Sequence, residues 1–220
     1  MLVLASCENG NLLSKNNEGT VVFDVTFPYE QNTLMLELYP KEMIMDFNRN
    51  YFHASLQSAW GVIATDVIVD NNQESYTQLF KSFGDKYSLT LDAEGVATWY
   101  ADKPKLSIEK TGDTLTIAGL LCDKYTAKFS NDSLPNITVF ATKEIGVNQS
   151  NWWNQFAGVD GFLMGYEVEQ YGKRMKLLAR EVTFNHVAPE KFVIPEGYTP
   201  MDMESMDKQI LKVVTEFMAP

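Results

Sequence analysis

The sequence predicts a mainly β (α+β) protein in which one strongly curved antiparallel sheet forms an incomplete barrel covered by one or two helices. Three observations predict this fold class. Apolar and polar residues alternate through most of the chain, short turn sequences separate the alternating segments, and an amphipathic stretch appears near the C-terminus. The concave face of such a sheet is either filled by side chains or left as a ligand cavity.

The first alternating segment sets the pattern for the others. In residues 20–27, Val21, Phe23 and Val25 share one face of a strand, whereas Asp24 lies on the other. Further strands are expected at residues 33–39, 42–47, 51–57, 61–70, 86–92, 105–110, 114–119, 123–129, 137–144, 162–169 and 174–187. Strands of this length with short links are typical of one meandering antiparallel sheet.

Two turns and one ambiguous segment complete the strand prediction. Hairpin turns are expected at residues 111–113 and 170–173, where glycine separates two alternating segments. Residues 74–83 fit a strand or a short helix, because a short apolar run satisfies both periodicities.

The C-terminal segment has the signals of a helix. Thr199 is expected to cap it, Pro200 suits the first helical position, and Asp202 complements the helix dipole. Apolar residues then recur at helical spacing, at Met206, Ile210, Val213, Val214 and Phe217. The sequence therefore predicts an amphipathic helix over about residues 200–218, whose apolar stripe covers another apolar surface.

Composition narrows the classes of function. The 220 residues carry a formal net charge of −11, which argues against a nucleic-acid groove and against electrostatic docking on anionic lipid. No apolar run approaches the length of a membrane-spanning helix. An apolar, neutral or cationic binding partner is expected instead. Cys122, in an apolar strand-like context, is expected to be a buried free thiol.

The N-terminus contains a short motif with a chemical meaning. The sequence LASC, which ends at Cys7, resembles the lipobox of bacterial lipoproteins, in which the cysteine thiol carries a diacylglycerol. Residues 1–6 would then be the tail of a signal peptide whose basic start is missing. Residues 7–18 would be a lipid-anchored flexible tether, and residues 19–220 a single domain.

Known catalytic and metal-binding motifs are absent from the sequence, so no metal or cofactor is expected. His53 and His186 lie on separate strand segments without an attached carboxylate or cysteine motif. A hydrolase that uses either histidine is a remote alternative, which requires a carboxylate beside it in a cleft. Asp132-Ser133-Leu134 resembles an O-glycosylation acceptor of some Gram-negative lipoproteins.

The most unusual stretch of the sequence is NQSNWWNQF, which holds two adjacent tryptophans. Neighbouring residues of an extended chain point in opposite directions, so either the segment is sandwiched in the core or one ring lines a cavity mouth. Methionines add polarisable side chains that suit variable apolar partners. The candidate ligand-binding residues are Trp152, Trp153, Phe156, Met164, Met43 and Met45.

Four segments carry a family resemblance: GTVVFDVTF, TIAGLLCDKY, LLAREVTF and KFVIPEGYTP. They resemble a group of uncharacterised Gram-negative outer-membrane lipoproteins whose domain is similar to the lipoprotein carriers LolA and LolB. The most specific residues are Ile117, Gly119, Cys122 and Lys124, and then Phe192, Pro195, Gly197 and Tyr198. The resemblance implies a curved antiparallel sheet that wraps helices, with a cavity between them for acyl chains.

Two departures from the carriers stand beside this resemblance. The carriers insert helices between their early strands, whereas here only residues 74–83 and the C-terminal segment are helix candidates. No cavity arginine can be carried over from them to this sequence.

These observations favour a non-enzymatic, monomeric lipoprotein of the cell envelope. Its membrane attachment would be the lipid on Cys7, and the resemblance implies the outer membrane, with the domain facing the periplasm or the cell surface. The concave face would bind a lipid or a lipoprotein acyl chain. The alternative is an envelope scaffold that binds a protein or a glycan through an exposed surface.

Overall fold

The computed structural model of the chain describes residues 16–58, 60–130 and 134–217, and within them twelve strands form one sheet. The strands are β1 (Gly19–Thr26), β2 (Glu42–Phe47), β3 (Tyr51–Gln57), β4 (Ile63–Asp70), β5 (Ser75–Ser82), β6 (Asp85–Leu91), β7 (Leu106–Ile117), β8 (Leu120–Phe129), β9 (Ile137–Thr142), β10 (Phe162–Gln170), β11 (Lys173–Thr183) and β12 (Thr199–Pro200). The helices are α1 (Thr33–Leu38), α2 (Ala93–Ala101), α3 (Met203–Phe217) and the 3-10 helix η2 (Pro189–Phe192).

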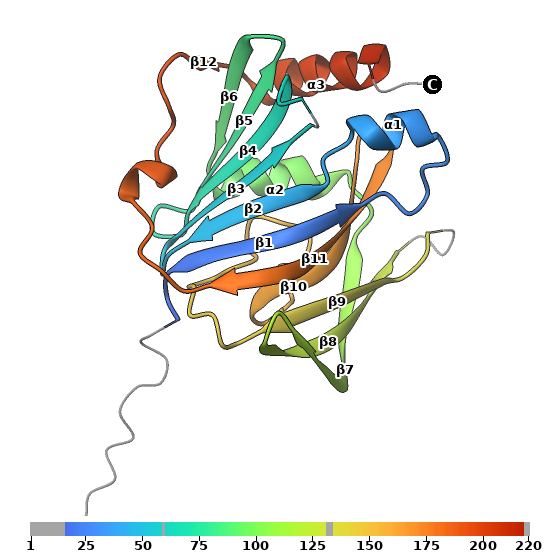
Figure 1. Cartoon of the computed structure of the whole chain (residues 1–220), viewed down its shortest axis with the longest axis vertical. Coiled ribbons are helices and arrows are strands. Elements are labelled where there is room, and N and C mark those ends of the chain that lie inside the picture. The colour runs from blue at the N-terminus through green and yellow to red at the C-terminus, as the bar shows by residue number, and fades with distance from the viewer. Residues whose placement is uncertain (1–15, 59, 131–133, 218–220) are drawn as a thin grey trace, which may run out of the picture.

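The sheet is open and bent. Its strand order is β12-β6-β5-β4-β3-β2-β1-β11-β10-β9-β8-β7, so β12 and β7 are its two edges and do not pair with each other. Every neighbouring pair is antiparallel except β12 with β6. Figure 1 shows β2 to β6 rising on one side of the bend and β7 to β9 lying on the other. The predicted fold class, a curved antiparallel sheet in an incomplete barrel with helices, is confirmed.

Alternation produces the core, as the sequence predicts. Val21 and Phe23 of β1 lie directly opposite Met45 and Met43 of β2, and all four side chains are buried. They point to the concave face, which carries the largest apolar cluster of the molecule. Cross-strand pairs of apolar side chains stabilise a sheet, so these pairs help to fix the register of β1 and β2.

Helix α3 covers one end of the concave face. Its buried Met206 and Ile210 pack with Phe80 of β5 and Leu89 of β6. The predicted amphipathic helix is therefore present, and its apolar stripe covers the sheet as expected.

The predicted start of this helix was wrong. Thr199 and Pro200 form β12, which pairs in parallel with β6, and the helix begins three residues later. Asp202 caps it, because a carboxylate oxygen of this residue accepts the backbone N–H of Ser205 at 2.8 Å. An aspartate that satisfies a free N–H at a helix start is a stronger cap than the more distant threonine.

The expected strand at residues 33–39 is also wrong, because this segment forms α1. Its leucine, methionine and glutamate residues have high helix propensity, and only Thr33 is β-branched. A run this short satisfies the strand and helix periods equally, so tertiary context decides between them. Residues 74–83, the expected strand-or-helix segment, lie mainly in strand β5.

The hairpin expected at residues 111–113 is wrong as well. Strand β7 continues through these residues, and the register with β8 shifts between Lys110 and Thr114, as in a β-bulge. The chain reverses at Ala118 and Gly119, whose φ angles of 48° and 84° fit a two-residue hairpin turn. The second expected turn is confirmed at Tyr171 and Gly172, with φ angles of 51° and 72°.

Helix α2 was not expected from the sequence. It interrupts the strands between β6 and β7, and its cap is Asp92, which accepts the backbone N–H of Gly95 at 2.8 Å. Helices α1 and α2 therefore lie between strands, so the expectation that only residues 74–83 and the C-terminal segment are helix candidates was wrong.

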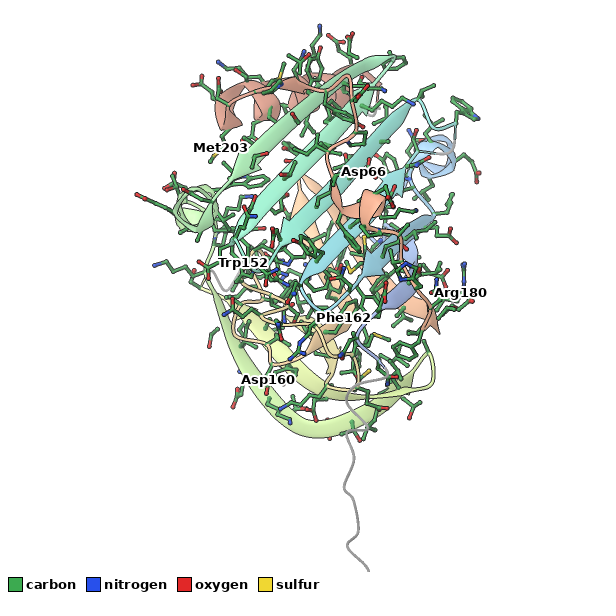
Figure 2. All side chains as sticks on the ribbon, turned by 90° about the vertical axis from the view of Figure 1, so that its left-hand side faces the viewer. Asp66, Trp152, Asp160, Phe162, Arg180 and Met203 are labelled. Atoms are coloured by element: carbon green, nitrogen blue, oxygen red, sulfur yellow. The ribbon has the colours of Figure 1, made fainter. Side chains whose placement is uncertain are left out.

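The chain between β11 and α3 crosses the convex face of the sheet. We call residues 187–202 the convex strap, and Figure 2 shows it passing over the strands of this face. The ring of Phe192 lies 5.5 Å from that of Tyr51, and Lys191 Nζ lies 3.1 Å from Asp46 Oδ2. The strap therefore shields part of the convex face from solvent.

Several sequence predictions lie outside the described residues. These are the signal-peptide tail at residues 1–6, the lipid attachment at Cys7, the tether up to residue 15, and Asp132 and Ser133 of the glycosylation motif. None of the helices in the described ranges has both the length and the apolar composition that crossing a membrane demands. Cys122 is fully buried with a free thiol, as expected, and burial raises its pKa to about 11.

A glycine before β10 gives a test of this fold. Gly161 has a φ of 123°, and a Cβ there would lie 2.6 Å from the carbonyl oxygen of Thr142 on β9. We expect Gly161→Ala to lower the free energy of unfolding by about 2–4 kcal/mol, measured by urea denaturation. Gly158→Ala is the control, because its Cβ would meet only Ile108 at 3.6 Å. Equal stability of the two variants would contradict the described approach of β9 and β10.

Candidate functional site

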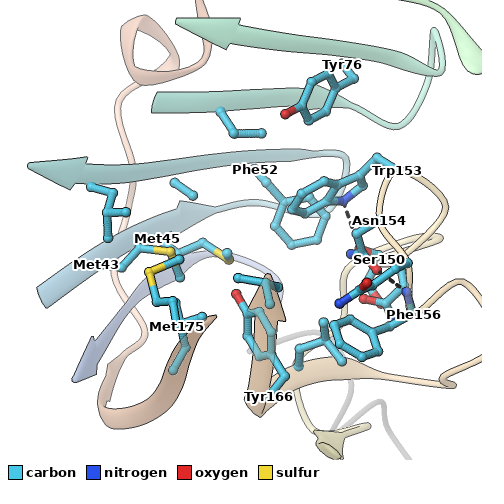
Figure 3. Close-up of a pocket in the computed structure, with 18 of the residues that line it drawn as sticks. Met43, Met45, Phe52, Tyr76, Ser150, Trp153, Asn154, Phe156, Tyr166 and Met175 are labelled. Atoms are coloured by element: carbon cyan, nitrogen blue, oxygen red, sulfur yellow. Dashed lines mark hydrogen bonds between the residues drawn. The ribbon is translucent and has the colours of Figure 1, made fainter. Parts of the chain in front are cut away.

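An apolar cavity of about 140 Å³ lies on the concave face, between the sheet and the loop at residues 143–161. Side chains from β2, β3, β4, β5, β10 and β11 line it together with that loop (Figure 3). The lining residues that matter most below are Met43, Met45, Phe52, Ala54, Trp153 and Met175. A dry cavity of similar volume in an engineered protein holds a benzene molecule, so this space is large enough for part of an apolar ligand.

The cavity exists because a small side chain lies among large ones. Ala54 on β3 pairs with Met45 on β2 and with Val67 on β4, and all three line the cavity. A longer side chain at position 54 would fill the space that alanine leaves. Figure 3 shows Met43, Met45 and Met175 side by side at one wall, where unbranched side chains can adapt their shape to a ligand.

The opposite wall is aromatic. The ring of Trp153 stacks on Tyr76 at 6.0 Å between centroids and lies 6.2 Å from Phe52. Its indole N–H donates to the carbonyl oxygen of Ser150 at 3.0 Å, so the polar edge of the ring is satisfied within the loop. The ring face is therefore free to form apolar surface.

The loop that carries Trp153 is fixed by one buried amide. Asn151 is 5% exposed, and its Nδ2 donates to the carbonyl oxygens of Val159 at 2.9 Å and Gly161 at 2.8 Å. Trp152 points elsewhere and donates its indole N–H to Asn71 Oδ1 at 2.8 Å. Trp152 therefore links the loop to Asn71, whereas Trp153 lines the cavity.

The structure brings together four of the six candidate ligand-binding residues. Met43, Met45, Trp153 and Phe156 line the cavity. Trp152 is half-buried and Met164 is fully buried, and neither lines it. That the four residues bind a ligand stays a prediction.

Sequence reasoning missed other lining residues, notably Phe52, Tyr76, Tyr166 and Met175. The signal that could have found them is the inward position of each in its alternating strand. That signal does not separate a cavity wall from a filled core, because both are apolar.

Two further cavities adjoin the first. The second, of about 140 Å³, lies beside α3 and shares Leu56, Thr65, Val168 and Met175 with the first cavity. The third, of about 310 Å³, is more polar and shares Lys103, Gln155 and Glu169 with the first cavity. Because they share lining residues, the second and third cavities both lie next to the first.

Charged groups of the described residues lie at both outer sections. At the second cavity, Lys173 Nζ lies 2.8 Å from Glu30 Oε2, and this ion pair is the main cause that lowers the pKa of Glu30 to about 2. At the third cavity, burial lowers the pKa of Lys103. Burial also raises the pKa of Tyr100, a wall residue of the first cavity, to about 12. The interior is therefore apolar at its centre and charged at its ends.

The two histidines each lie beside a carboxylate. His53 Nε2 is 3.2 Å from Asp66 Oδ1, and His186 Nδ1 is 2.8 Å from Glu18 Oε1. Neither histidine lines any of the three cavities. The described residues hold no cluster of three or more histidine, cysteine, aspartate or glutamate side chains that could bind a metal ion.

The fold and the interior define a class of protein: an open β half-barrel whose concave face encloses a mainly apolar space. No known family and no curated protein sequence matches the chain. Solved structures of PNGF-II in two crystal forms share the fold, at 12% identity and TM-scores of 0.56 and 0.55, over 89% of this chain. The match covers 34% and 33% of PNGF-II, so this chain spans about a third of its length.

More distant likenesses involve two other structures. LprF from Mycobacterium bovis matches over 84% of this chain and 96% of its own, at 15% identity and a TM-score of 0.31. The Pseudomonas aeruginosa MucA/MucB complex matches over 83% of this chain and 57% of the matched chain, at 7% identity and a TM-score of 0.40. These values describe a distant likeness in fold.

The buried amide of the loop gives a prediction. Asn151→Ala removes both donated hydrogen bonds, so we expect a loss of about 2 kcal/mol of unfolding free energy and faster amide hydrogen exchange in residues 150–161. The control is Asn154→Ala, since the half-buried Asn154 makes one bond, to the backbone N–H of Phe156. A loss for Asn154→Ala as large as that for Asn151→Ala would contradict the assigned role.

Proposed function

We propose that this protein is a non-enzymatic binding module that holds an alkyl chain, of a lipid or of an acylated protein, in its concave interior. The observation that carries the proposal is the apolar cavity at the centre of the concave face, with methionines on one wall and aromatic rings on the other. Burial of each CH₂ group there contributes about 0.8 kcal/mol.

The shape of the interior favours a chain over a compact ligand. Each apolar section holds about 140 Å³, which is less than the volume of a typical pocket for a drug-sized molecule. The two sections share four lining residues, so a narrow, flexible chain could pass from one to the other. A rigid ring system would fill one section and leave the other empty.

The proposed location is the cell envelope, with attachment to the outer membrane through a lipid on Cys7. The support is the LASC motif and the carrier-like sequence segments. A fully extended chain from Cys7 to Asn16 would reach about 30 Å, which would let the domain work close to a membrane surface.

The alternative, a scaffold that binds a protein or a glycan, would be favoured by Trp152 and Trp153 exposed on a flat surface. Trp152 and Trp153 are both half-buried, and Trp153 faces the cavity, so they support the alkyl-binding function instead. A second envelope protein remains part of the proposal as the donor or acceptor of the acylated ligand.

A cavity-filling variant tests this function. Ala54→Phe places a ring in the first cavity, and we expect several-fold less lipid in organic extracts of the purified protein, measured by mass spectrometry. Thr65→Phe, on the neighbouring strand, is a second filling variant in case the first one fails to fold.

The matched control is Ile44→Phe, because Ile44 lies between Met43 and Met45 but is 41% exposed on the convex face. Thermal unfolding would verify that each variant is folded. Wild-type protein without bound lipid, or equal lipid in the folded filling variants and the control, would refute the proposed function.

A further inference from the structure

Lys103 differs from the other cation that lines the interior. Lys173 at the second cavity is neutralised by Glu30 at 2.8 Å. Lys103 follows α2, is half-buried, and lines both the first and the third cavity. Among the described residues, no carboxylate forms an ion pair with it; its Nζ lies 4.7 Å from the ring centroids of both Trp99 and Tyr100.

No carboxylate of the described residues lies within ion-pair distance of this ammonium group. Burial lowers the pKa of Lys103, and Asp207, which lines the same third cavity, is a more distant negative charge that acts to raise it. Partial burial removes water from Nζ, and the two rings recover only part of that solvation. A ligand with a negative charge would supply the missing partner, and the free energy of that contact would add to the burial of an attached chain.

Aromatic rings connect Lys103 to the apolar interior. The Trp99 ring contacts Tyr76 at 5.5 Å, and Tyr76 stacks on Trp153 at 6.0 Å. A row of aromatic rings therefore runs from the ammonium group to the wall of the first cavity. A molecule with a charged head and an alkyl tail would place its head at Lys103 and its tail along this row.

Nearby carboxylates restrict the charge of the head. Glu169 and Asp207 also line the third cavity, and Asp207 accepts a hydrogen bond from the Tyr171 hydroxyl at 2.8 Å. These groups would repel a doubly charged anion more than a singly charged one. The third cavity, at about 310 Å³, has room for a head larger than the tail sections allow.

We infer that Lys103 is an anion-binding residue that selects, for the proposed alkyl-binding site, amphiphiles with a singly charged head such as a carboxylate or a phosphodiester. This inference rests on the proposed function and adds the class of head and its orientation. The head lies in the third cavity and the tail extends into the first.

The test compares ligands that share one tail. Delipidated protein would be titrated by calorimetry with laurate, lauroyl-lysophosphatidylglycerol and monolaurin, which have a carboxylate, a phosphodiester and a neutral head. We expect wild-type protein to bind at least one of the two anions about tenfold more tightly than monolaurin, and the stronger of the two identifies the source of the charge.

Variants then assign the preference to one residue. Lys103→Gln should bind the anions as weakly as monolaurin, Lys103→Arg should restore the preference, and the exposed Lys105→Gln should behave as wild type. The inference is overturned if wild-type protein binds neither anion more tightly than monolaurin, or if Lys103→Gln still prefers the anions. In either case, binding of monolaurin would leave the proposed alkyl-binding function standing. Absence of binding by all three ligands overturns both.

Discussion

The structure depends on the burial of one face of a bent sheet. Strands β1 to β3 fill that face mainly with apolar side chains, and the bend brings β4 and β5 opposite β10 and β11 across a shared cavity. Helix α3 covers the far end, and the loop of residues 143–161 covers the near end. The first cavity lies between this loop and the sheet, and the second lies beside α3. The interior is therefore a consequence of how these two elements pack on the concave face.

The same constraint explains why the interior has distinct sections. At the centre, Ala54 leaves space among methionine and aromatic side chains, and the polar edge of the Trp153 ring is satisfied by the carbonyl oxygen of Ser150. At the ends lie charged side chains: Lys173 forms an ion pair with Glu30, whereas Lys103 lies over the Trp99 ring with no carboxylate of the described residues at ion-pair distance. A chain with an apolar tail and a charged head matches this order of environments better than a uniformly polar molecule does.

Most strands of the sheet could be predicted from the sequence, whereas the short helix α1 and the position of one hairpin turn could not. Strict alternation in β1 to β3 and the amphipathic pattern of α3 carry strong signals, because each pattern must match the face that it buries. The predictions for short segments were wrong. The α1 segment fits the strand period and the helix period equally well. Gly112 lies at a register shift of the β7–β8 pair, whereas the turn forms at Gly119. For the site, the two-tryptophan stretch identified Trp153 and Phe156 as lining residues, and the abundance of methionine identified Met43 and Met45. Lys103 was not identified, because its role depends on which distant residues surround it.

The most direct test of the central claim is the location of a bound alkyl chain. A crystal of the protein grown with a fatty acid that carries bromine at its terminal carbon would show that carbon by its anomalous scattering. The account predicts a bromine peak inside the concave interior, beside Met45, Ala54 and Trp153. Peaks found only on the convex face, or an interior without any peak at saturating ligand, would contradict it.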